Sequence, residues 1–267
     1  MIRGLLRVAK RIGLGLILLF LIMPIIVVVL LSLGPDPTVA FPPTGVSLKW
    51  YIALFSEREW LNALFQSLQI SLLATLFSFV FGLLGSIAVY DMRPRMLLSR
   101  VSFALFVTPL FVPAIVLGIG LSRITGVFQL PDSLSVALSL SVVSTPLFMI
   151  CTVVAMQGVD VQLKNAAASL GASGLSTFFL VTMPLIRRGL VIGTFIAFLV
   201  SIDELVITVF VAPPGIQTLP IKFWSALRFY TSPLIAPVST VMLLVMLVVL
   251  TFAFFYGARH EESESAK

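Results

Sequence analysis

Residues 164–184 read KNAAASLGASGLSTFFLVTMP and lie between two long apolar segments. The run of alanines favours a helix, and Gly171 suits the left-handed conformation that ends one. The small and hydroxyl residues of 173–177 suggest a turn and a new N-cap, while Pro184 predicts the break of the second helix. We therefore expect a helix–turn–helix with a flat alanine surface on the cytoplasmic side of a membrane. The alternative is an ordinary amphipathic helix at the membrane surface.

The composition around this stretch is that of a membrane protein. Of the 267 residues, 59% are hydrophobic and 10% are charged, with a mean hydropathy of +1.14. An average soluble domain has about 25% charged residues. The net charge of +6 comes from basic residues that lie between apolar runs, so we expect no nucleic-acid partner.

Few residues are available for covalent or metal chemistry. The one cysteine, Cys151, lies in an apolar run, and the one histidine, His260, lies in the tail. The chain also has no G-x-x-x-x-G-K-[ST] phosphate loop and no recognisable nucleophile–base arrangement. We predict neither a catalytic residue nor a metal or cofactor site, and hence a protein that is not an enzyme.

Apolar segments long enough to cross a bilayer need about 20 residues. They predict an all-α polytopic protein with six transmembrane helices, at 12–33, 62–90, 100–122, 133–157, 185–209 and 233–257. The N-terminal segment is longer than the apolar region of a typical signal peptide, which favours a retained first helix over a cleaved one.

Basic residues predict the orientation of these helices. Most of the 17 Lys and Arg residues fall before the first helix, after the even-numbered ones and around 164–188. Both termini should therefore be cytoplasmic. We expect a cytoplasmic N-terminus at 1–11, a transmembrane domain at 12–257 and a polar cytoplasmic tail at 258–267. Within the transmembrane domain, 34–61 should form an external loop and 158–184 a cytoplasmic segment.

Small residues and prolines predict how the helices pack. Ala74, Ser78, Gly82 and Ser86 form a stripe on one face of the second helix, which serves packing within the chain or an interface with another subunit. Four prolines lie inside the predicted segments, and each is expected to bend its helix: Pro24, Pro109, Pro113 and Pro146. The third helix, with two of them, is a candidate to line a pathway, although ordinary kinking explains it as well. Three aromatic residues, Trp50, Tyr51 and Trp60, suggest an aromatic belt and a short interfacial helix.

The segment 164–184 resembles the coupling loop of importer-type ABC permeases, E-A-A-x3-G-x9-I-x-L-P. Here Asn165 replaces the glutamate, Val181 the isoleucine and Met183 the leucine. The resemblance implies a type I ABC importer permease whose loop docks into a separate ATPase dimer, which would bind the ATP and Mg. It implies coupling residues Asn165, Ala166, Ala167, Gly171, Ala172 and Pro184. Asn165 lacks a carboxylate that could pair with an arginine of the ATPase, but it can still form hydrogen bonds.

Other motifs resemble the spermidine/putrescine permease group, in particular its second membrane subunit. They are F-P-P-x-G-x-S-x-x-W-Y at 41–51, Q-S-L at 66–68, S-I-D-E-L at 201–205, T-L-P at 218–220 and S-P at 232–233. The resemblance implies a second permease subunit in a heterodimer, an extracytoplasmic solute-binding protein, and a multi-pass location in the bacterial inner membrane. It also implies inward movement of a small cationic, polyamine-like solute by alternating access.

Two acids lie in the fifth predicted helix. Asp203 is 15 residues beyond Arg188, roughly 22 Å deeper at 1.5 Å per residue, and Glu204 follows it. Intramembrane acids usually face a cavity or a partner. We expect Asp203, and to a lesser extent Glu204, to attract a cationic solute. The alternatives are an ion pair with Arg123 or Lys222, or exposure to external water.

Aromatic residues near these acids are further pathway candidates. Trp224, Phe229 and Tyr230 could contact a cation through their rings, but a membrane-interface belt explains them equally well. Two other functions stay open: a permease of the same family for an opine, amino-acid-like or ferric cargo, and an ion-coupled secondary transporter.

Overall fold

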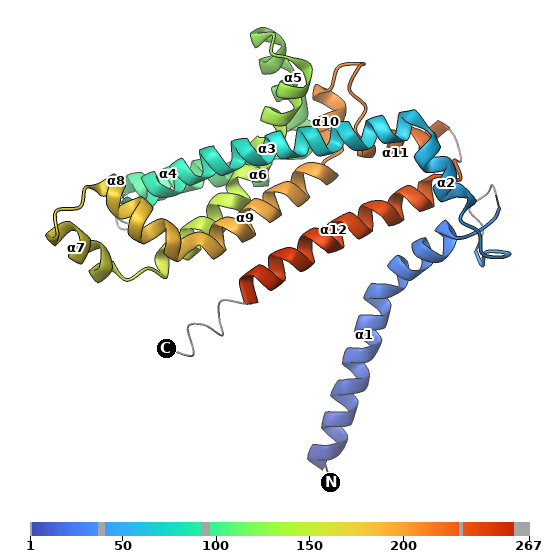
Figure 1. Cartoon of the computed structure of the whole chain (residues 1–267), viewed down its shortest axis with the longest axis horizontal. Helices are drawn as coiled ribbons and strands as arrows, with labels where there is room; N and C mark the ends of the chain where they lie inside the picture. The colour runs from blue at the N-terminus through green and yellow to red at the C-terminus, as the bar shows by residue number, and fades with distance from the viewer. Residues whose placement is uncertain (1, 37–40, 92–96, 230–231, 259–267) are drawn as a thin grey trace. The chain divides into compact units, whose positions relative to one another are not determined.

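The computed structural model describes residues 2–36, 41–91, 97–229 and 232–258, and this part of the chain is helical with no strand. The chain divides into two compact units, which are described separately. The first comprises Met1–Leu61 with Phe223–Val245, and the second Asn62–Lys222 with Met246–Lys267. Figure 1 shows the course of the helices within each.

The first unit contains α1 (Ile2–Ser32), α2 (Lys49–Ser56), the first turn of α3 (Arg58–Asp91), most of α11 (Leu219–Phe229) and the first half of α12 (Ile235–Ala258). The predicted first helix is confirmed and continues through Pro24. The predicted short helix within the external loop is α2, whose Tyr51 hydroxyl lies 2.7 Å from the Ser32 hydroxyl. Trp60 is buried and packs edge-to-face on Phe223 with 5.8 Å between ring centroids, so its predicted place in an exposed aromatic belt is wrong.

The second unit is built on α3, α6 and α9, with shorter helices at both ends. Its elements after α3 are α4 (Leu97–Val107), the 3₁₀ turn η1 (Thr108–Phe111), α5 (Ala114–Phe128), α6 (Asp132–Gln157), α7 (Val161–Ser169), α8 (Gly174–Thr177), the π-helical turn η2 (Phe178–Thr182), α9 (Met183–Asp203), α10 (Val206–Val211) and the start of α11.

The small-residue stripe of α3 packs against α6 of the same chain. Its members are buried, and the hydroxyls of Ser78 and Ser144 lie 2.7 Å apart. A Cβ atom on Gly82 would stand 2.5 Å from Cδ1 of Phe148, whose ring is fully buried. Of the two interpretations of the stripe, packing within the chain is the one that the structure shows, because only small residues let these two helices approach so closely.

Helix α9 packs even more closely on α6. A Cβ atom on Gly189 would collide with the Cβ atom of Ala155 and lie 3.1 Å from the carbonyl oxygen of Cys151. Phe148, Met156, Ile186 and Leu190 belong to the buried cluster between these helices. The pairing fixes the helix that follows the 164–184 segment against the centre of the unit.

The third predicted helix, 100–122, is not straight. It consists of α4 with η1 and then α5, which turns away by 106°, as Figure 1 shows. Pro109 lies in η1, and Pro113 precedes α5 as its N-cap. Neither proline can donate a backbone hydrogen bond, so the predicted bend is confirmed and is a full break.

The fifth predicted helix, 185–209, differs at both ends. The helix runs without a break from Gly174 to Asp203, so the expected break at Pro184 is wrong. The reason is η2, in which the Met183 N–H donates to the carbonyl of Phe178, five residues back. This π-helical register shifts the carbonyls away from the proline ring and lets the helix continue.

The described helices agree with a polytopic membrane protein. Five are long and apolar enough to cross a bilayer, or six if the bent pair of α4 with η1 and α5 forms one span. Prolines do not break them all, because α6 continues through Pro146.

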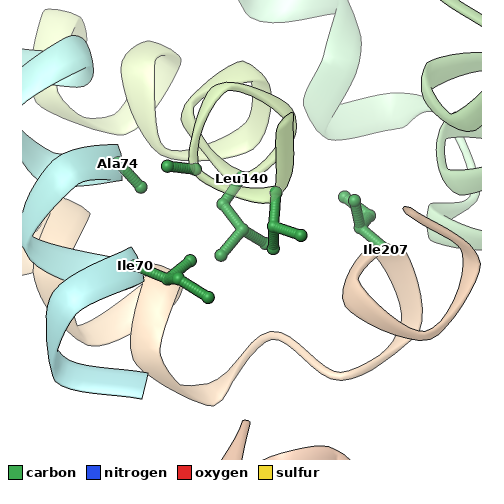
Figure 2. Close-up of a cluster of buried hydrophobic side chains, with 6 residues drawn as sticks. Ile70, Ala74, Leu140 and Ile207 are labelled. Carbon is green, nitrogen blue, oxygen red and sulfur yellow. The ribbon is translucent and has the colours of Figure 1, made fainter. Parts of the chain in front are cut away.

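The end of this core that lies nearest the start of α3 is formed between α3, α6 and α10. Figure 2 shows Ile70 and Ala74 of α3 beside Leu140 of α6 and Ile207 of α10. Residues of α5 pack on the same cluster, and a Cβ atom on Gly118 of α5 would lie 3.0 Å from the side chain of Phe210. This cluster fixes α10, and with it the break that follows Asp203.

Candidate functional site

The 164–184 segment folds as the sequence predicts up to Pro184. Asp160 is the N-cap of helix α7, and its carboxylate accepts a hydrogen bond from the Gln162 N–H at 2.9 Å. It ends at Ser169 with Leu170 as the C-cap, and the next residue, Gly171, has a φ of +83°. The N–H groups of Gly171 and Ala172 donate to the carbonyls of Ala168 and Ala167, both at 3.0 Å. These are the two hydrogen bonds of a Schellman motif, which satisfies carbonyls that a helix end leaves without partners.

A second helix starts immediately after this turn. Ser173 is the N-cap of α8, and its hydroxyl accepts from the N–H of Ser176 at 3.2 Å. From there α8, η2 and α9 form one helix. The turn therefore joins α7 and α8 in a hairpin at one end of the second unit, as Figure 1 shows.

The hairpin exposes apolar side chains beside its alanines. None of the residues of α7 is buried, and the predicted coupling residues Asn165 and Ala166 are exposed while Ala167 and Ala172 are half-buried. Leu170 is 89% exposed and Leu175 is 73% exposed. Sequence reasoning missed these two leucines, although their positions on either side of Gly171 would have singled them out. Pro184 is exposed but lies inside the continuous helix.

A cavity of about 570 Å³ lies behind the hairpin. Its walls come from the end of α3, from α6 and from the hairpin, and they are apolar apart from a few groups that include Tyr90, Asp91 and Lys164. The ammonium group of Lys164 lies 4.0 Å from the centroid of the Tyr90 ring. Burial lowers the pKa of Lys164, and the neighbouring Asp91 carboxylate opposes this by raising it.

The two predicted acids lie at the break between α9 and α10 and have different surroundings. Asp203 is the last residue of α9 and is exposed, and its carboxylate has no hydrogen bond or ion pair with the described residues. The Glu204 carboxylate accepts from the Ile207 N–H at 3.0 Å, which caps α10. Glu204 therefore has a structural role at this break, and Asp203 is the acid that stays available.

Ser201 also belongs to this break, although sequence reasoning gave it no role of its own. Its side chain is 4% exposed, and its hydroxyl has no hydrogen-bond partner in the described part of the chain. A helix end leaves four carbonyls without intrahelical partners. The end of α9 therefore adds backbone oxygen acceptors to the break at which Asp203 lies.

Of the three aromatic candidates, Trp224 is the one whose side chain the structure describes. Trp224 belongs to the first unit, whereas Asp203 belongs to the second. The guanidinium carbon of Arg228 lies 4.8 Å from the centroid of the Trp224 ring, so one face of this ring already has a cation. Tyr230 lies outside the described residues, and the same holds for the side chain of Phe229.

Two of the motifs that are far apart in sequence meet at the other end of α3. The Gln66 side-chain oxygen accepts from the Gln217 N–H at 2.7 Å, and the Ser67 hydroxyl accepts from the Leu219 N–H at 2.7 Å. The start of α3 therefore holds the segment before α11, and Ser67 caps that helix. We call these two contacts the Gln66–Ser67 clamp.

The described residues contain no group of three or more His, Cys, Asp or Glu side chains that could hold a metal ion. The geometry accordingly offers two functional features, namely the exposed hairpin at one end of the second unit and the carboxylate at the helix break.

Comparison with known proteins identifies relatives of this chain. Residues 79–262 match the model of a family described as the binding-protein-dependent transport system inner membrane component. The putrescine transport system permease protein PotI of Escherichia coli K12 is 27% identical over 251 residues, which cover 91% of this chain and 88% of PotI. The spermidine/putrescine transport system permease protein PotC of the same strain is 29% identical over 206 residues, covering 76% of this chain and 77% of PotC.

A solved structure shows the same fold. It is the bacterial alginate ABC transporter in complex with an alginate pentasaccharide-bound periplasmic protein, which superposes with a TM-score of 0.72 at 15% identity. The superposition covers 96% of this chain and 94% of the transporter chain.

Proposed function

Because this chain belongs to the binding-protein-dependent transport system inner membrane component family and is a permease subunit of an ABC importer, we propose that it moves a small cationic, polyamine-like solute inward by alternating access. The solute would be putrescine-like or spermidine-like, since PotI and PotC carry these names. The free carboxylate of Asp203 at the break after α9 is the observation that carries this assignment.

The break suits an ammonium group for electrostatic reasons. A cation that leaves water needs a charge partner and further oxygen acceptors, or its desolvation cost is not offset. Asp203 supplies the charge, and the end of α9 supplies carbonyls at the negative end of its helix dipole. Glu204 contributes little, because its carboxylate already caps α10.

The driving force would enter at the hairpin. Fully burying a leucine side chain stabilises a complex by about 1.5–3 kcal/mol, and Leu170 and Leu175 are mostly exposed in this chain. We propose that a groove of a separate ATPase dimer covers them together with Asn165, Ala166 and Ala172. The ATPase would bind ATP and Mg, and this chain would carry out no covalent chemistry.

The remaining partners follow from the family. A second permease subunit would form a heterodimer with this chain, and a solute-binding protein would deliver the solute from outside, as a periplasmic protein is bound to the alginate transporter. The family description and the apolar helices fit the bacterial inner membrane. We propose that both termini lie in the cytoplasm, as the distribution of basic residues indicates.

Uptake of radiolabelled putrescine by cells with the complete transporter tests the solute assignment. Asp203→Asn should raise the KM for putrescine at least tenfold, since one lost charge contact with a desolvated ammonium is worth about 1.5–3 kcal/mol. Glu204→Gln is the matched control, because glutamine keeps an oxygen that can accept from the Ile207 N–H, and its KM should stay within about threefold of wild type. Equal effects of the two substitutions would contradict a special role for Asp203.

Uptake of another solute would identify a different cargo. If the copurified binding protein binds an opine, an amino acid or ferric ion but no polyamine, the alternative permease of the same family is correct and the polyamine assignment is wrong.

A further inference from the structure

Helix α7 is held weakly to the rest of the second unit. None of its residues is buried, and the elements that pack on it are its own continuation, α8 and η2. One contact that reaches α3 is made by Lys164, whose ammonium lies 4.0 Å from the centroid of the Tyr90 ring. Asp91, the last residue of α3, adds an electrostatic attraction to the same ammonium.

Helix α3 connects this contact with the opposite end of the unit. It is one continuous helix over Arg58–Asp91, and the 24 residues from Gln66 to Tyr90 span about 36 Å at 1.5 Å per residue. The far end carries the Gln66–Ser67 clamp on the segment before α11. Between the ends, α3 packs on α6 along its small-residue stripe.

We propose that Lys164 is a positioning residue that transmits displacement of α7 to α3, in addition to the covalent route through α8 and α9. This proposal rests on the proposed coupling of the hairpin to an ATPase. Displacement of the hairpin would then reach two helices. One is α9, which leads to Asp203, and the other is α3, which leads to the Gln66–Ser67 clamp. A cation over a ring suits this task, because the attraction tolerates sliding of the ammonium across the ring face.

The cavity behind the hairpin is consistent with a moving part. It has a volume of about 570 Å³ and lies between α3, α6 and the hairpin. The pocket is half open at the surface of the unit, so α7 can approach α3 there without displacing other helices. Lys164 stands at the polar edge of this space with Tyr90 and Asp91.

The test uses the complete complex in liposomes, with its ATPase and with the binding protein as purified. Lys164→Gln should lower binding-protein-stimulated ATP hydrolysis about two- to fivefold, the range expected for losing one partly exposed cation–ring contact. Copurification of the ATPase and its basal hydrolysis should not change. Lys164→Arg should restore the stimulation because a guanidinium also binds over a ring, and Lys10→Gln serves as the matched control on exposed α1.

Substitution of the ring separates this role from a direct contact with the ATPase. Tyr90→Leu should reproduce the loss, Tyr90→Phe should not, and combining Tyr90→Leu with Lys164→Gln should add no further loss. Unchanged stimulation in Lys164→Gln would overturn the proposal. Additive losses, or reduced copurification of the ATPase, would show that Lys164 contacts the ATPase itself and would overturn it as well.

The same experiment distinguishes failure of the proposed function. If Leu170→Asp leaves the stimulation and the copurification of the ATPase unchanged, the hairpin is not the coupling element, and both proposals are wrong. If Leu170→Asp uncouples the complex while Lys164→Gln behaves as wild type, only the role of Lys164 is wrong.

Discussion

The Gln66–Ser67 clamp makes a quantitative prediction through Ser67→Ala. Ser67 is 3% exposed and Leu219, whose N–H it accepts at 2.7 Å, is 1% exposed. The substitution leaves this N–H at the start of α11 without an acceptor in a place that water does not reach. An unsatisfied buried donor costs about 1–3 kcal/mol, and a lost N-cap hydroxyl typically costs about 1 kcal/mol.

This cost can be measured as a shift of the thermal midpoint in detergent. At about 2–4 °C per kcal/mol for a chain of this size, a cost of about 1–3 kcal/mol means that Ser67→Ala should lower the Tm by about 2–12 °C. Ser139→Ala is the matched control, because Ser139 is equally buried but its hydroxyl only donates to the Ser135 carbonyl of its own helix, at 2.8 Å. That carbonyl keeps its helical partner, so the control should shift by less than about 2 °C.

Two results would refute this reasoning. Equal shifts for both serines would show that Ser67 acts through packing alone. No shift for either would show that the start of α11 is not held by the Ser67 hydroxyl.

Three further predictions follow from the geometry. Gly189→Ala should lower the Tm and the yield of folded protein, since its Cβ atom would collide with α6 and overpacking costs about 1–3 kcal/mol. Gly120→Ala is the control and should be neutral or stabilising, because no atom lies within 4 Å of the added Cβ. A larger loss in Gly120→Ala than in Gly189→Ala would contradict the close approach of α6 and α9. Leu175→Asp should abolish copurification of the ATPase. The Tm should not change, because the side chain is exposed. Val46→Asp is the control, since Val46 is also exposed but lies in the external loop, and it should not affect copurification. Glu204→Leu should lower the Tm by about 2–4 °C through loss of the α10 cap, and an unchanged Tm would argue against capping.

Local sequence signals predicted the hairpin almost completely. The alanine run forms α7, Gly171 adopts a positive φ, and Ser173 caps the next helix. Each of these outcomes depends on backbone conformations that single residue types favour or disfavour. The stripe of small residues on α3 was equally readable, because a spacing of four residues places the side chains on one helix face.

The helix breaks needed the tertiary structure. Pro184 looks like a helix breaker, yet the π-helical turn before it keeps the helix continuous, and Pro113, in a segment of similar composition, ends one helix and starts another. Glu204 and Asp203 are adjacent acids in sequence, and only the break between α9 and α10 separates a capping carboxylate from an available one.

The sequence by itself therefore determined the membrane location, the number of apolar segments and the hairpin, because composition and local backbone preference act within a few residues. Only the tertiary structure decided which polar groups meet across the chain. Gln66 and Ser67 lie about 150 residues from Gln217 and Leu219, and Lys164 lies far along the chain from Tyr90. Contacts of this kind arise when packed helices bring their ends together, and no periodicity within either segment encodes its partner.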